Sequence, residues 1–369
     1  MKILYIISTM EGGGAQKLLH GLATGINKKN RCEILVLSAK NDRFSEDIRK
    51  NGTKCTFIPD EVKGIIGKLR YMDIYIGQGR FDIVHVHLFP ALYYGSILKR
   101  FRYGSVPFIY TEHSTDNRRR HRKWLRPAEK WIYAPYEYTV SISEDTRSEL
   151  IKWIGASKKT KRKFPVINNG VPLDEYRNAK PYERRKIHPQ IGNKDVLLCM
   201  TGSFTEQKNH RFMIDVMKKL PRNYKLIFLG EGVLQDEIKD MVIRSSLKDR
   251  VFFMGFRKDA ASFMKSSDIA VIPSKWEGFG LAAVEAMACG KPVVCFDVPG
   301  ISSVVGQAGM RVKARDSEKF AKSILKEAEG MKLDEKISQL QRQADLFDIE
   351  FMTESYLRLY QRCISHRKR

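Results

Sequence analysis

Residues 2–23 read KILYIISTMEGGGAQKLLHGLA, and this stretch decides the fold class. Lys2–Ser8 is a short apolar run rich in isoleucine, which predicts a β-strand. The glycines at 12–14 end the run, and Leu18 and Leu22 then recur at helical spacing. A strand, a glycine loop and a helix in this order predict the start of a parallel β-α-β arrangement.

The same alternation of apolar runs and amphipathic stretches continues along the chain. Further strands are predicted at Cys32–Leu37, Cys55–Ile58, Ile83–Leu88, Phe108–Thr111, Tyr138–Ile142 and Pro165–Ile167. A second series is predicted at Val196–Met200, Leu226–Leu229, Val251–Met254, Ile269–Ile272, Pro292–Phe296 and Arg311–Lys313. Strands that alternate with helices predict parallel sheets covered on both faces. The expected fold class is therefore α/β, with two consecutive doubly wound parallel sheets.

A polar segment at 179–194 separates the two series of strands. It contains two prolines and a glycine and has no sustained hydrophobic period, which is typical of a linker. We therefore predict domains at 1–178 and 195–346, followed by a helical segment at 347–369. Open α/β sheets bind ligands outside the carboxyl ends of their strands, so the functional residues are expected in strand-to-helix loops facing a crevice between the domains.

Composition narrows the function classes. The chain has 369 residues, of which 66 are Lys or Arg and 42 are Asp or Glu, and the net charge of +24 favours an anionic partner. No apolar run approaches the ~18 residues of a membrane-spanning helix, and a cytoplasmic protein is expected. The six cysteines lack the paired spacing of a zinc site, so no metal is expected.

The sharpest motif is the glycine-rich segment Glu277–Glu285, which follows a predicted strand and begins a predicted helix. Free backbone N–H groups at such a helix start form an anion site, which suits a diphosphate. Glu277 and Glu285 flank this site and can accept hydrogen bonds from sugar and ribose hydroxyls. The alternative is structural, with Glu277 capping the helix and Glu285 on a solvated face.

Residues 273–294, PSKWEGFGLAAVEAMACGKPVV, resemble the E-x7-E signature of retaining glycosyltransferases of family 4, with Glu277 and Glu285 as the two acids. The likeness covers nearly the whole chain. It implies the GT-B architecture, in which two Rossmann-like domains face each other across a crevice. The first domain binds the acceptor, the second binds the nucleotide-sugar donor, and a tail corresponding to 347–369 crosses back to the first domain.

The resemblance also implies roles for the motif residues. Glu277 would contact the donor sugar, Glu285 would hold the ribose, and the donor would meet the segment between them at Gly278, Phe279, Gly280 and Leu281. No cofactor and no bound metal are implied, because the nucleotide sugar is a substrate. The resemblance implies transfer of sugars such as hexoses or N-acetylhexosamines from uridine nucleotides, in the assembly of bacterial surface polysaccharides on lipid carriers.

A second loop, at 201–210, contains Lys208 just before the next predicted helix. A lysine there can neutralise the charge that develops on a departing diphosphate. The alternative is an ordinary surface lysine. The family pattern is Arg-x5-Lys, and this chain has Ser203 where the arginine is expected. Either the Ser203 hydroxyl with backbone donors is sufficient, or another cation reaches the site, or the diphosphate is held less tightly.

Other strand-to-helix loops supply weaker candidates. Gly13 and Gly14 permit close approach of the backbone to a ligand, although tight turns also need glycine. Relatives bring this loop to the donor phosphates, and they place segments like those at Glu231 and Phe256 on the crevice side and beside the nucleobase. His113 follows a predicted strand where a histidine is often structural, but in relatives it contacts the donor sugar. We therefore predict Glu277, Lys208 and His113 as the catalytic residues.

A basic run at 118–126 mixes cations with tryptophan. A charge run is usually a solvated face, yet Lys, Arg and Trp together are typical of an interfacial patch on anionic lipid. The run contains the predicted membrane or acceptor patch Arg118, Arg119, Arg120, Arg122, Lys123 and Trp124. Nucleic acid is the rival anionic partner, but no RNA-binding or DNA-binding motif accompanies the charge.

The function that follows is a retaining glycosyltransferase, which transfers a sugar from a nucleotide-diphosphate sugar to a glycan or a lipid-linked acceptor. Its expected place is the cytoplasm, in peripheral contact with the inner face of the membrane. A sugar-nucleotide epimerase of the same fold is one alternative, and it would need no acceptor. A basic nucleic-acid-binding protein, in which the glycine loops are only turns, is the other.

Overall fold

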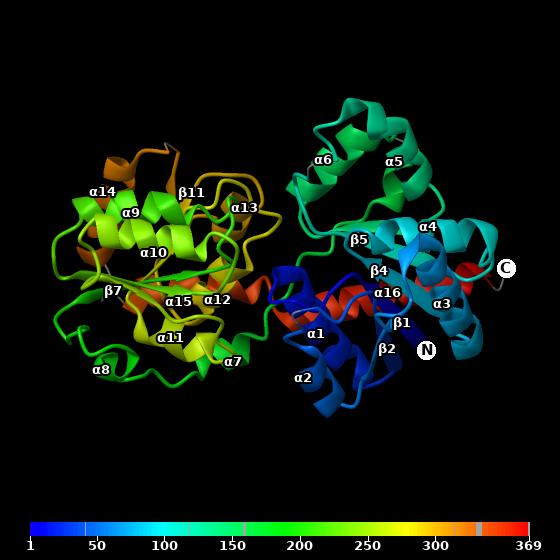
Figure 1. Cartoon of the computed structure of the whole chain (residues 1–369), viewed down its shortest axis with the longest axis horizontal. Coiled ribbons are helices and arrows are strands. Elements are labelled where there is room, and N and C mark those ends of the chain that lie inside the picture. Colours follow the sequence, from blue (N-terminus) through cyan, green and yellow to red (C-terminus); the bar gives the residue numbers. More distant parts are fainter. Residues whose placement is uncertain (41, 118, 158–159, 314, 330–333, 368–369) are drawn as a thin grey trace. The chain divides into compact units, whose positions relative to one another are not determined.

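The computed structural model describes residues 1–40, 42–117, 119–157, 160–313, 315–329 and 334–367. The chain forms two units (Figure 1). Unit 1 comprises Met1–Gly170 and Ile349–Arg369, and unit 2 comprises Val171–Asp348. Within the described ranges, no helix combines the length and the apolar character needed to cross a lipid bilayer.

Unit 1 contains a six-stranded parallel sheet with the order β3-β2-β1-β4-β5-β6. The strands are β1 (Lys2–Ile7), β2 (Arg31–Val36), β3 (Lys54–Phe57), β4 (Ile83–His87), β5 (Phe108–Glu112) and β6 (Tyr138–Ser141). The helices are α1 (Gly14–Asn27), α2 (Ser45–Lys50), α3 (Gly64–Gly79), α4 (Ala91–Phe101), α5 (Arg126–Tyr133), α6 (Glu144–Ile154) and α16 (Ile349–Arg367), with short 3₁₀ turns at Lys123–Leu125 and Lys161–Lys163.

Unit 2 also contains a six-stranded parallel sheet, with the order β12-β11-β10-β7-β8-β9. The strands are β7 (Val196–Thr201), β8 (Tyr224–Leu229), β9 (Val251–Phe253), β10 (Ile269–Ile272), β11 (Val293–Phe296) and β12 (Met310–Val312). The helices are α7 (Leu173–Arg177), α8 (Arg184–Ile187), α9 (His210–Lys219), α10 (Gln235–Arg244), α11 (Ala260–Ser266), α12 (Leu281–Ala288), α13 (Ile301–Val305), α14 (Ser317–Glu329) and α15 (Asp334–Asp345).

The apolar strand runs arise because each sheet has a core on both faces. In β1, Ile3, Tyr5 and Ile7 belong to one core cluster, whereas Leu4 and Ile6 point to the other. Successive side chains of a strand alternate between faces, so a strand that is covered on both sides is apolar at nearly every position. The predicted fold class of two doubly wound α/β sheets is confirmed.

One predicted strand did not form as such. The segment Pro165–Ile167 makes an isolated parallel bridge between Ser141 and Val166, not a seventh strand. Its backbone still pairs at the edge of the sheet, since the Ser141 amide donates to Pro165 and the Ile167 amide donates to Ser141. The apolar run was therefore read correctly as extended but is too short for a full strand.

The passage from unit 1 to unit 2 lies at Gly170, earlier than the predicted domain end at residue 178. The intervening helix α7 buries Leu173 and Tyr176 and packs against α11 and α12 of unit 2. These apolar contacts attach the helix to unit 2, although the polar residues after it suggested a later boundary.

The segment predicted as a linker, 179–194, is packed onto unit 2. Arg184 makes an ion pair of 2.7 Å with Asp268, and the Tyr182 hydroxyl donates to Asp259 at 2.6 Å. Ile191 is fully buried. The lack of hydrophobic period reflects an irregular segment held by individual side chains, with a single turn of helix at α8.

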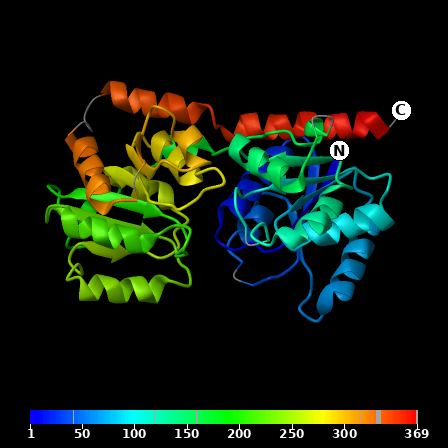
Figure 2. The same cartoon turned by 90° about the horizontal axis from the view of Figure 1, so that it is seen from above.

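The C-terminal helix α16 belongs to unit 1 and lies beside α1 (Figure 2). The predicted tail at 347–369 thus starts its contact with unit 1 at Ile349. A Cβ added at Gly21 or Gly25 of α1 would meet Ile349 or Thr353 at under 3.0 Å, so the two helices approach closely where α1 has no side chain. Tyr360 of α16 reaches the core, where its hydroxyl lies 3.3 Å from the hydroxyl of Tyr5.

Candidate active site

The strand order of unit 2 reverses between β7 and β10, which are neighbours in the sheet. The helices that follow two such strands lie on opposite faces, and the loops after the strands diverge and leave room for a ligand. In unit 2 these loops are 202–209 and 273–280. They contain the two motifs that the sequence singled out.

Several hydrogen bonds join these two loops. The Lys275 amide donates to the Gln207 carbonyl at 2.8 Å, and the Gln207 side chain donates to the Trp276 carbonyl at 3.0 Å. The Asn209 side chain donates to the Pro273 carbonyl at 3.1 Å. Gln207 and Asn209 are positioning residues that the sequence reading missed, although both flank Lys208 in the motif.

Lys208 and Glu277 meet at the centre of this junction. The ammonium Nζ of Lys208 lies 2.6 Å from Oε1 of Glu277, and their side chains are 22% and 7% exposed. A charged pair at this depth is strengthened by the reduced dielectric, and the remaining exposure of the lysine leaves it open to a further anion. The structure therefore brings together two of the three predicted catalytic residues.

The loop ends at Gly280, which caps α12 with the left-handed torsion φ +96°. Gly300 packs against the other side of the loop, and a Cβ added there would lie 2.3 Å from the Glu277 carbonyl oxygen. Gly300, at φ +88°, was not predicted from the sequence to pack on this loop, and its signal is the glycine that follows Pro299. Glu285 is buried on α12 and thus does not lie on a solvated face.

The other residues of the motif differ in burial. Gly278 is buried in the loop, and Leu281 begins α12 with partial exposure. Phe279 is buried, and its ring packs edge-on against Phe347 with 5.2 Å between centroids. The side chain of Phe279 is therefore part of the core, and only its backbone remains for a donor.

The loops after β7, β8 and β9 lie side by side. A Cβ added at Gly230 would meet the Gly202 carbonyl oxygen at 2.2 Å, so these glycines allow backbone to pack on backbone. The Phe256 amide lies 3.4 Å from a carboxylate oxygen of Glu231 and donates to it. Ser203 and the partly exposed Phe256 thus adjoin the same carboxyl end of the sheet as Lys208.

The remaining predicted site residues belong to unit 1. Gly13 caps α1 in an extended conformation with φ −127°, and the Gln16 side chain lies over it. Gly14 is the exposed first residue of α1. His113 follows β5, and its Nε2 lies 3.0 Å from Nδ1 of His87. His85 also lies in this region, where Nδ1 contacts Tyr360 and Nε2 contacts Thr111, each at 2.7 Å.

The predicted basic patch is partly wrong, because two of its cations point inward. Arg120 makes an ion pair with the buried carboxylate of Glu112 at 3.1 Å, and the hydroxyl of Tyr133 donates to the same carboxylate at 2.7 Å. Arg119 lies 3.5 Å from the fully buried Glu129. Burial acts to lower the pKa of Arg120, but the Glu112 carboxylate together with the nearby tyrosines Tyr133 and Tyr110 raises it, so the charge is retained.

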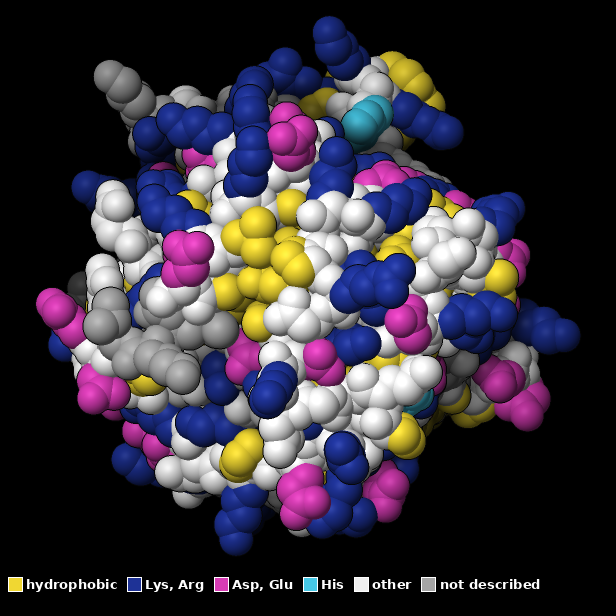
Figure 3. Space-filling model, turned by 90° about the vertical axis from the view of Figure 1, so that its left-hand side faces the viewer, with side chains coloured by type: hydrophobic (Ala, Val, Ile, Leu, Met, Phe, Trp, Pro, Cys, Tyr) yellow, Lys and Arg dark blue, Asp and Glu magenta, His cyan; other side chains and the backbone are white. Residues whose placement is uncertain are grey.

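The rest of the patch is exposed. Arg122, Lys123 and Trp124 all face solvent, and Arg118 lies outside the described residues. Trp131 of α5 and Phe101 of α4 are also exposed, with their rings 6.4 Å apart. In contrast, the face of unit 2 in Figure 3 carries Lys and Arg side chains scattered among Asp and Glu.

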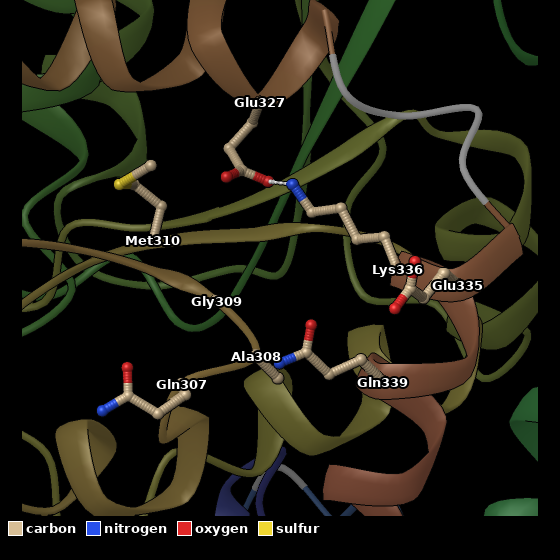
Figure 4. A pocket seen from close by; sticks show the side chains of 8 residues that line it. All are labelled: Gln307, Ala308, Gly309, Met310, Glu327, Glu335, Lys336 and Gln339. Atoms are coloured by element: carbon tan, nitrogen blue, oxygen red, sulfur yellow. Dashed lines mark hydrogen bonds and ion pairs between the residues drawn. The ribbon is translucent and has the colours of Figure 1, made fainter.

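A separate cavity of about 390 Å³ lies between α14, α15 and the segment before β12 (Figure 4). Lys336 reaches Glu327 across it, and the other lining side chains come mainly from Gln307, Met310, Glu335 and Gln339. None of the residues that line this cavity is a predicted site residue. The motif loops, not this cavity, therefore form the candidate site.

Two family models match successive parts of the chain. Residues 12–175 match the model for Glycosyltransferase Family 4, and residues 183–344 match the model for Glycosyl transferases group 1. The chain belongs to the glycosyltransferases. In this glycosyltransferase the first match lies in unit 1 except for residues 171–175, and the second lies within unit 2.

Curated relatives are glycosyltransferases of moderate identity. The chain is 28% identical over 267 residues to the uncharacterized glycosyltransferase MJ1607 of Methanocaldococcus jannaschii, covering 69% of this chain and 65% of the relative. It is 27% identical over 262 residues to the UDP-Gal:alpha-D-GlcNAc-diphosphoundecaprenol alpha-1,3-galactosyltransferase of Escherichia coli, covering 67% and 66%. The alignments thus span about two thirds of these relatives.

A solved structure shares the fold of this glycosyltransferase over almost its full length. HepE of Anabaena, crystallised with UDP-glucose, superposes with a TM-score of 0.84 at 21% identity and covers 98% of this chain and 99% of its own. The match establishes the two-domain GT-B fold that the resemblance implied.

Proposed function

We propose that this glycosyltransferase transfers a sugar from a UDP-sugar to a hydroxyl of a lipid-linked or glycan acceptor, with retention at the anomeric carbon. The observation that carries the proposal is the Lys208–Glu277 pair at the point where the strand order of unit 2 reverses. Glu277 lies on a loop that ends at the glycine-capped start of α12. Ligands of open α/β sheets bind at such points.

Each group at this junction suits one part of a nucleotide sugar. Lys208 would neutralise the diphosphate, the α12 amides would donate to phosphate or sugar oxygens, and Glu277 would accept from sugar hydroxyls. Glu285 would hold the ribose. In the transfer, the bond from the anomeric carbon to the diphosphate breaks, a bond to the acceptor oxygen forms, and the acceptor proton leaves with the diphosphate. The leaving-group charge is therefore greatest beside Lys208.

The donor and the acceptor class are supported by relatives. HepE was crystallised with UDP and with UDP-glucose, and the name of the Escherichia coli relative specifies UDP-Gal as donor and a diphosphoundecaprenol acceptor. A Campylobacter jejuni relative, 26% identical over 166 residues, is also named for transfer to a diphospho-undecaprenol acceptor. Retention rests on the family resemblance.

Binding of UDP to the purified protein, measured by calorimetry, tests the donor site. Lys208→Ala and Glu285→Ala should each weaken the binding at least tenfold, because each removes a charged hydrogen-bond partner. Lys248→Ala, at an exposed lysine near the opposite end of the sheet, serves as the control. UDP binding that neither site variant weakens would contradict the site assignment.

The acceptor distinguishes transfer from epimerisation. A transferase releases UDP only when an acceptor such as an undecaprenyl-diphosphate sugar is present, whereas an epimerase converts the nucleotide sugar without one. Incubation of the protein with UDP-sugars, with and without the lipid acceptor, separates the two. Conversion that is independent of the acceptor would favour the epimerase.

We further propose that unit 1 contacts an anionic membrane through a surface that we call the aromatic-basic patch. It consists of Arg100, Phe101, Arg122, Lys123, Trp124 and Trp131. Trp124 and Phe101 are 73% and 67% exposed, and the Arg100 guanidinium lies 4.2 Å from the centre of the Trp131 ring. Tryptophan and cations suit the headgroup region of anionic lipid. The patch would keep a cytoplasmic enzyme at the inner face of the membrane, where lipid-linked acceptors occur.

A further inference from the structure

His87 and His113 form an imidazole pair at the carboxyl end of the unit 1 sheet. His87 ends β4 and pairs in register with Thr111 of β5, which brings it beside the residue that follows that strand. Nδ1 of His87 lies 3.0 Å from Nε2 of His113, within hydrogen-bond distance. The His87 ring is fully buried, and its centroid lies 4.2 Å from that of His85.

Both rings of the pair are neutral at physiological pH. Burial lowers the pKa of His87 well below its ordinary value, with the neighbouring histidines acting in the same direction, and burial lowers the pKa of His113 to about 3. A neutral imidazole carries a proton on only one of its two nitrogens. One ring must therefore donate the hydrogen bond, and the other must accept it.

The second ring nitrogen of His87, Nε2, indicates which of the two imidazoles donates this hydrogen bond. Nε2 of His87 is buried and has no hydrogen-bond partner in the part of the chain that the structure describes. If it carried the proton, a buried N–H group would remain unsatisfied, which folded proteins rarely tolerate. The proton therefore belongs on Nδ1 of His87, which donates to Nε2 of His113. His113 must then carry its own proton on Nδ1.

We propose that His87 is a positioning residue that fixes His113 in the tautomer with a protonated Nδ1. His113 is partly exposed, and in this tautomer it presents a hydrogen-bond donor to a ligand rather than an acceptor. The matching ligand group is an oxygen with free lone pairs, such as a hydroxyl or ring oxygen of the transferred sugar. Only this identification of the ligand rests on the proposed function. The tautomer itself does not.

Nuclear magnetic resonance of protein labelled with ¹⁵N only at histidine reads the tautomer directly, without substrate. The His113 signals are assigned by their loss in His113→Asn. We expect a protonated Nδ1 and a bare Nε2 in the wild-type protein, and a shift toward protonated Nε2, the form that a free imidazole prefers, in His87→Leu. A protonated Nε2 of His113 in the wild-type protein would overturn the proposal, and this result does not depend on whether His87→Leu folds.

The matched control is His85→Gln. His85 bonds to Tyr360 and Thr111 and not to His113, so this variant should keep the wild-type tautomer of His113. A His85→Gln spectrum in which His113 changes tautomer, or a folded His87→Leu in which it does not, would count against a specific role of His87.

Sugar transfer provides an independent readout. Asparagine places its amide nitrogen near the position of Nδ1, whereas glutamine places it near Nε2, so His113→Asn should retain roughly tenfold more kcat/KM than His113→Gln. His87→Leu should lower kcat roughly tenfold in the wild-type background and have little effect in His113→Asn. Equal losses in both backgrounds would overturn the catalytic consequence. A protein with no transfer activity would fail the proposed function, and the tautomer measurement would still decide the role of His87.

Discussion

The ammonium of Lys208 lies 2.6 Å from the carboxylate of Glu277, although 69 residues separate them in the chain. The two side chains meet because β7 and β10 are neighbours in the sheet and the loops after them are joined by hydrogen bonds. In the absence of a donor, each charge compensates the other. A diphosphate that enters this site would share the ammonium with Glu277.

Loss of Lys208 should affect the chemical step more than donor binding. Lys208→Ala removes a cation from the point where the leaving group gains charge, so we expect kcat to fall about 10²- to 10³-fold. Steady-state release of UDP during sugar transfer measures the effect. Lys248→Ala should transfer sugar at the wild-type rate, and a Lys208→Ala enzyme of wild-type kcat would refute the role of Lys208.

Loss of the Glu277 charge should separate binding of UDP from sugar transfer. In Glu277→Gln the ammonium of Lys208 loses its charged partner and is more available to the diphosphate, so UDP should bind at least as tightly as to the wild-type protein. Sugar transfer should fall about tenfold or more, because the carboxylate no longer orients the sugar. Parallel calorimetry and transfer assays check both, and a Glu277→Gln enzyme that transfers at full rate would exclude Glu277 from catalysis.

Gly300 should be required for the shape of the donor loop. In Gly300→Ala the new Cβ would lie 2.3 Å from the Glu277 carbonyl oxygen at a residue with φ +88°, so the loop must shift. We expect a loss of stability of about 1–3 kcal/mol, with weaker UDP binding. Gly104→Ala is the matched control, because no atom lies within 4 Å of its added Cβ. Thermal unfolding and calorimetry that show the two variants to be alike would contradict this packing.

The aromatic-basic patch should govern membrane binding, whereas Arg120 should govern stability. Trp124→Ala combined with Arg122→Ser should weaken sedimentation with vesicles that contain anionic lipid, and added salt should weaken the binding of the wild-type protein. Vesicle binding that is unchanged in the patch variant would end the membrane proposal.

Arg120→Ser should destabilise unit 1 by about 3–5 kcal/mol, because it leaves the buried Glu112 carboxylate without its cation.

Acid should destabilise the protein through its buried histidines. Burial lowers the pKa of His210 to about 3, so the unfolded chain takes up a proton below about pH 6.5 that the folded protein excludes. The free energy of unfolding should therefore fall as the pH decreases, by up to about 1.4 kcal/mol per pH unit for each such histidine.

His210→Phe isolates this effect. Both ring nitrogens of His210 lack hydrogen-bond partners among the described residues, and the ring stacks on Phe204 with 4.0 Å between centroids, so phenylalanine should fit. Denaturant unfolding between about pH 7 and about pH 5 should show a shallower pH dependence in the variant. An identical slope would mean that His210 is not protonated on unfolding in this range.

The fold was predictable because its signals are local. An apolar run such as β1 must be buried on both faces, and a run of this kind followed by a glycine loop and an amphipathic helix has few other arrangements. Glu277 and Glu285 were singled out from the sequence because the glycine-rich helix start between them is a contiguous signal, and Lys208 was singled out in the loop after another predicted strand. The contact between Lys208 and Glu277 was not predicted from the sequence, because it depends on the order of strands in the sheet.

The contacts of individual side chains could not be predicted from the sequence, because a charge pattern does not show which residues the fold packs against each side chain. Arg119 and Arg120 read as surface cations until the fold places Glu112 and Glu129 against them. Residues 179–194 read as a linker because their contacts with unit 2 are individual ion pairs and hydrogen bonds without a period. The contact of His87 with His113 could not be predicted either, because it depends on the pairing of β4 with the neighbouring strand β5.

A crystal structure of the protein with a bound UDP-sugar tests the central claim most directly. The account predicts the diphosphate within hydrogen-bond distance of Lys208 Nζ and of the backbone amides at the start of α12, with the sugar against Glu277 and the ribose against Glu285. A nucleotide sugar bound elsewhere, with the Lys208–Glu277 pair intact and untouched, would contradict it.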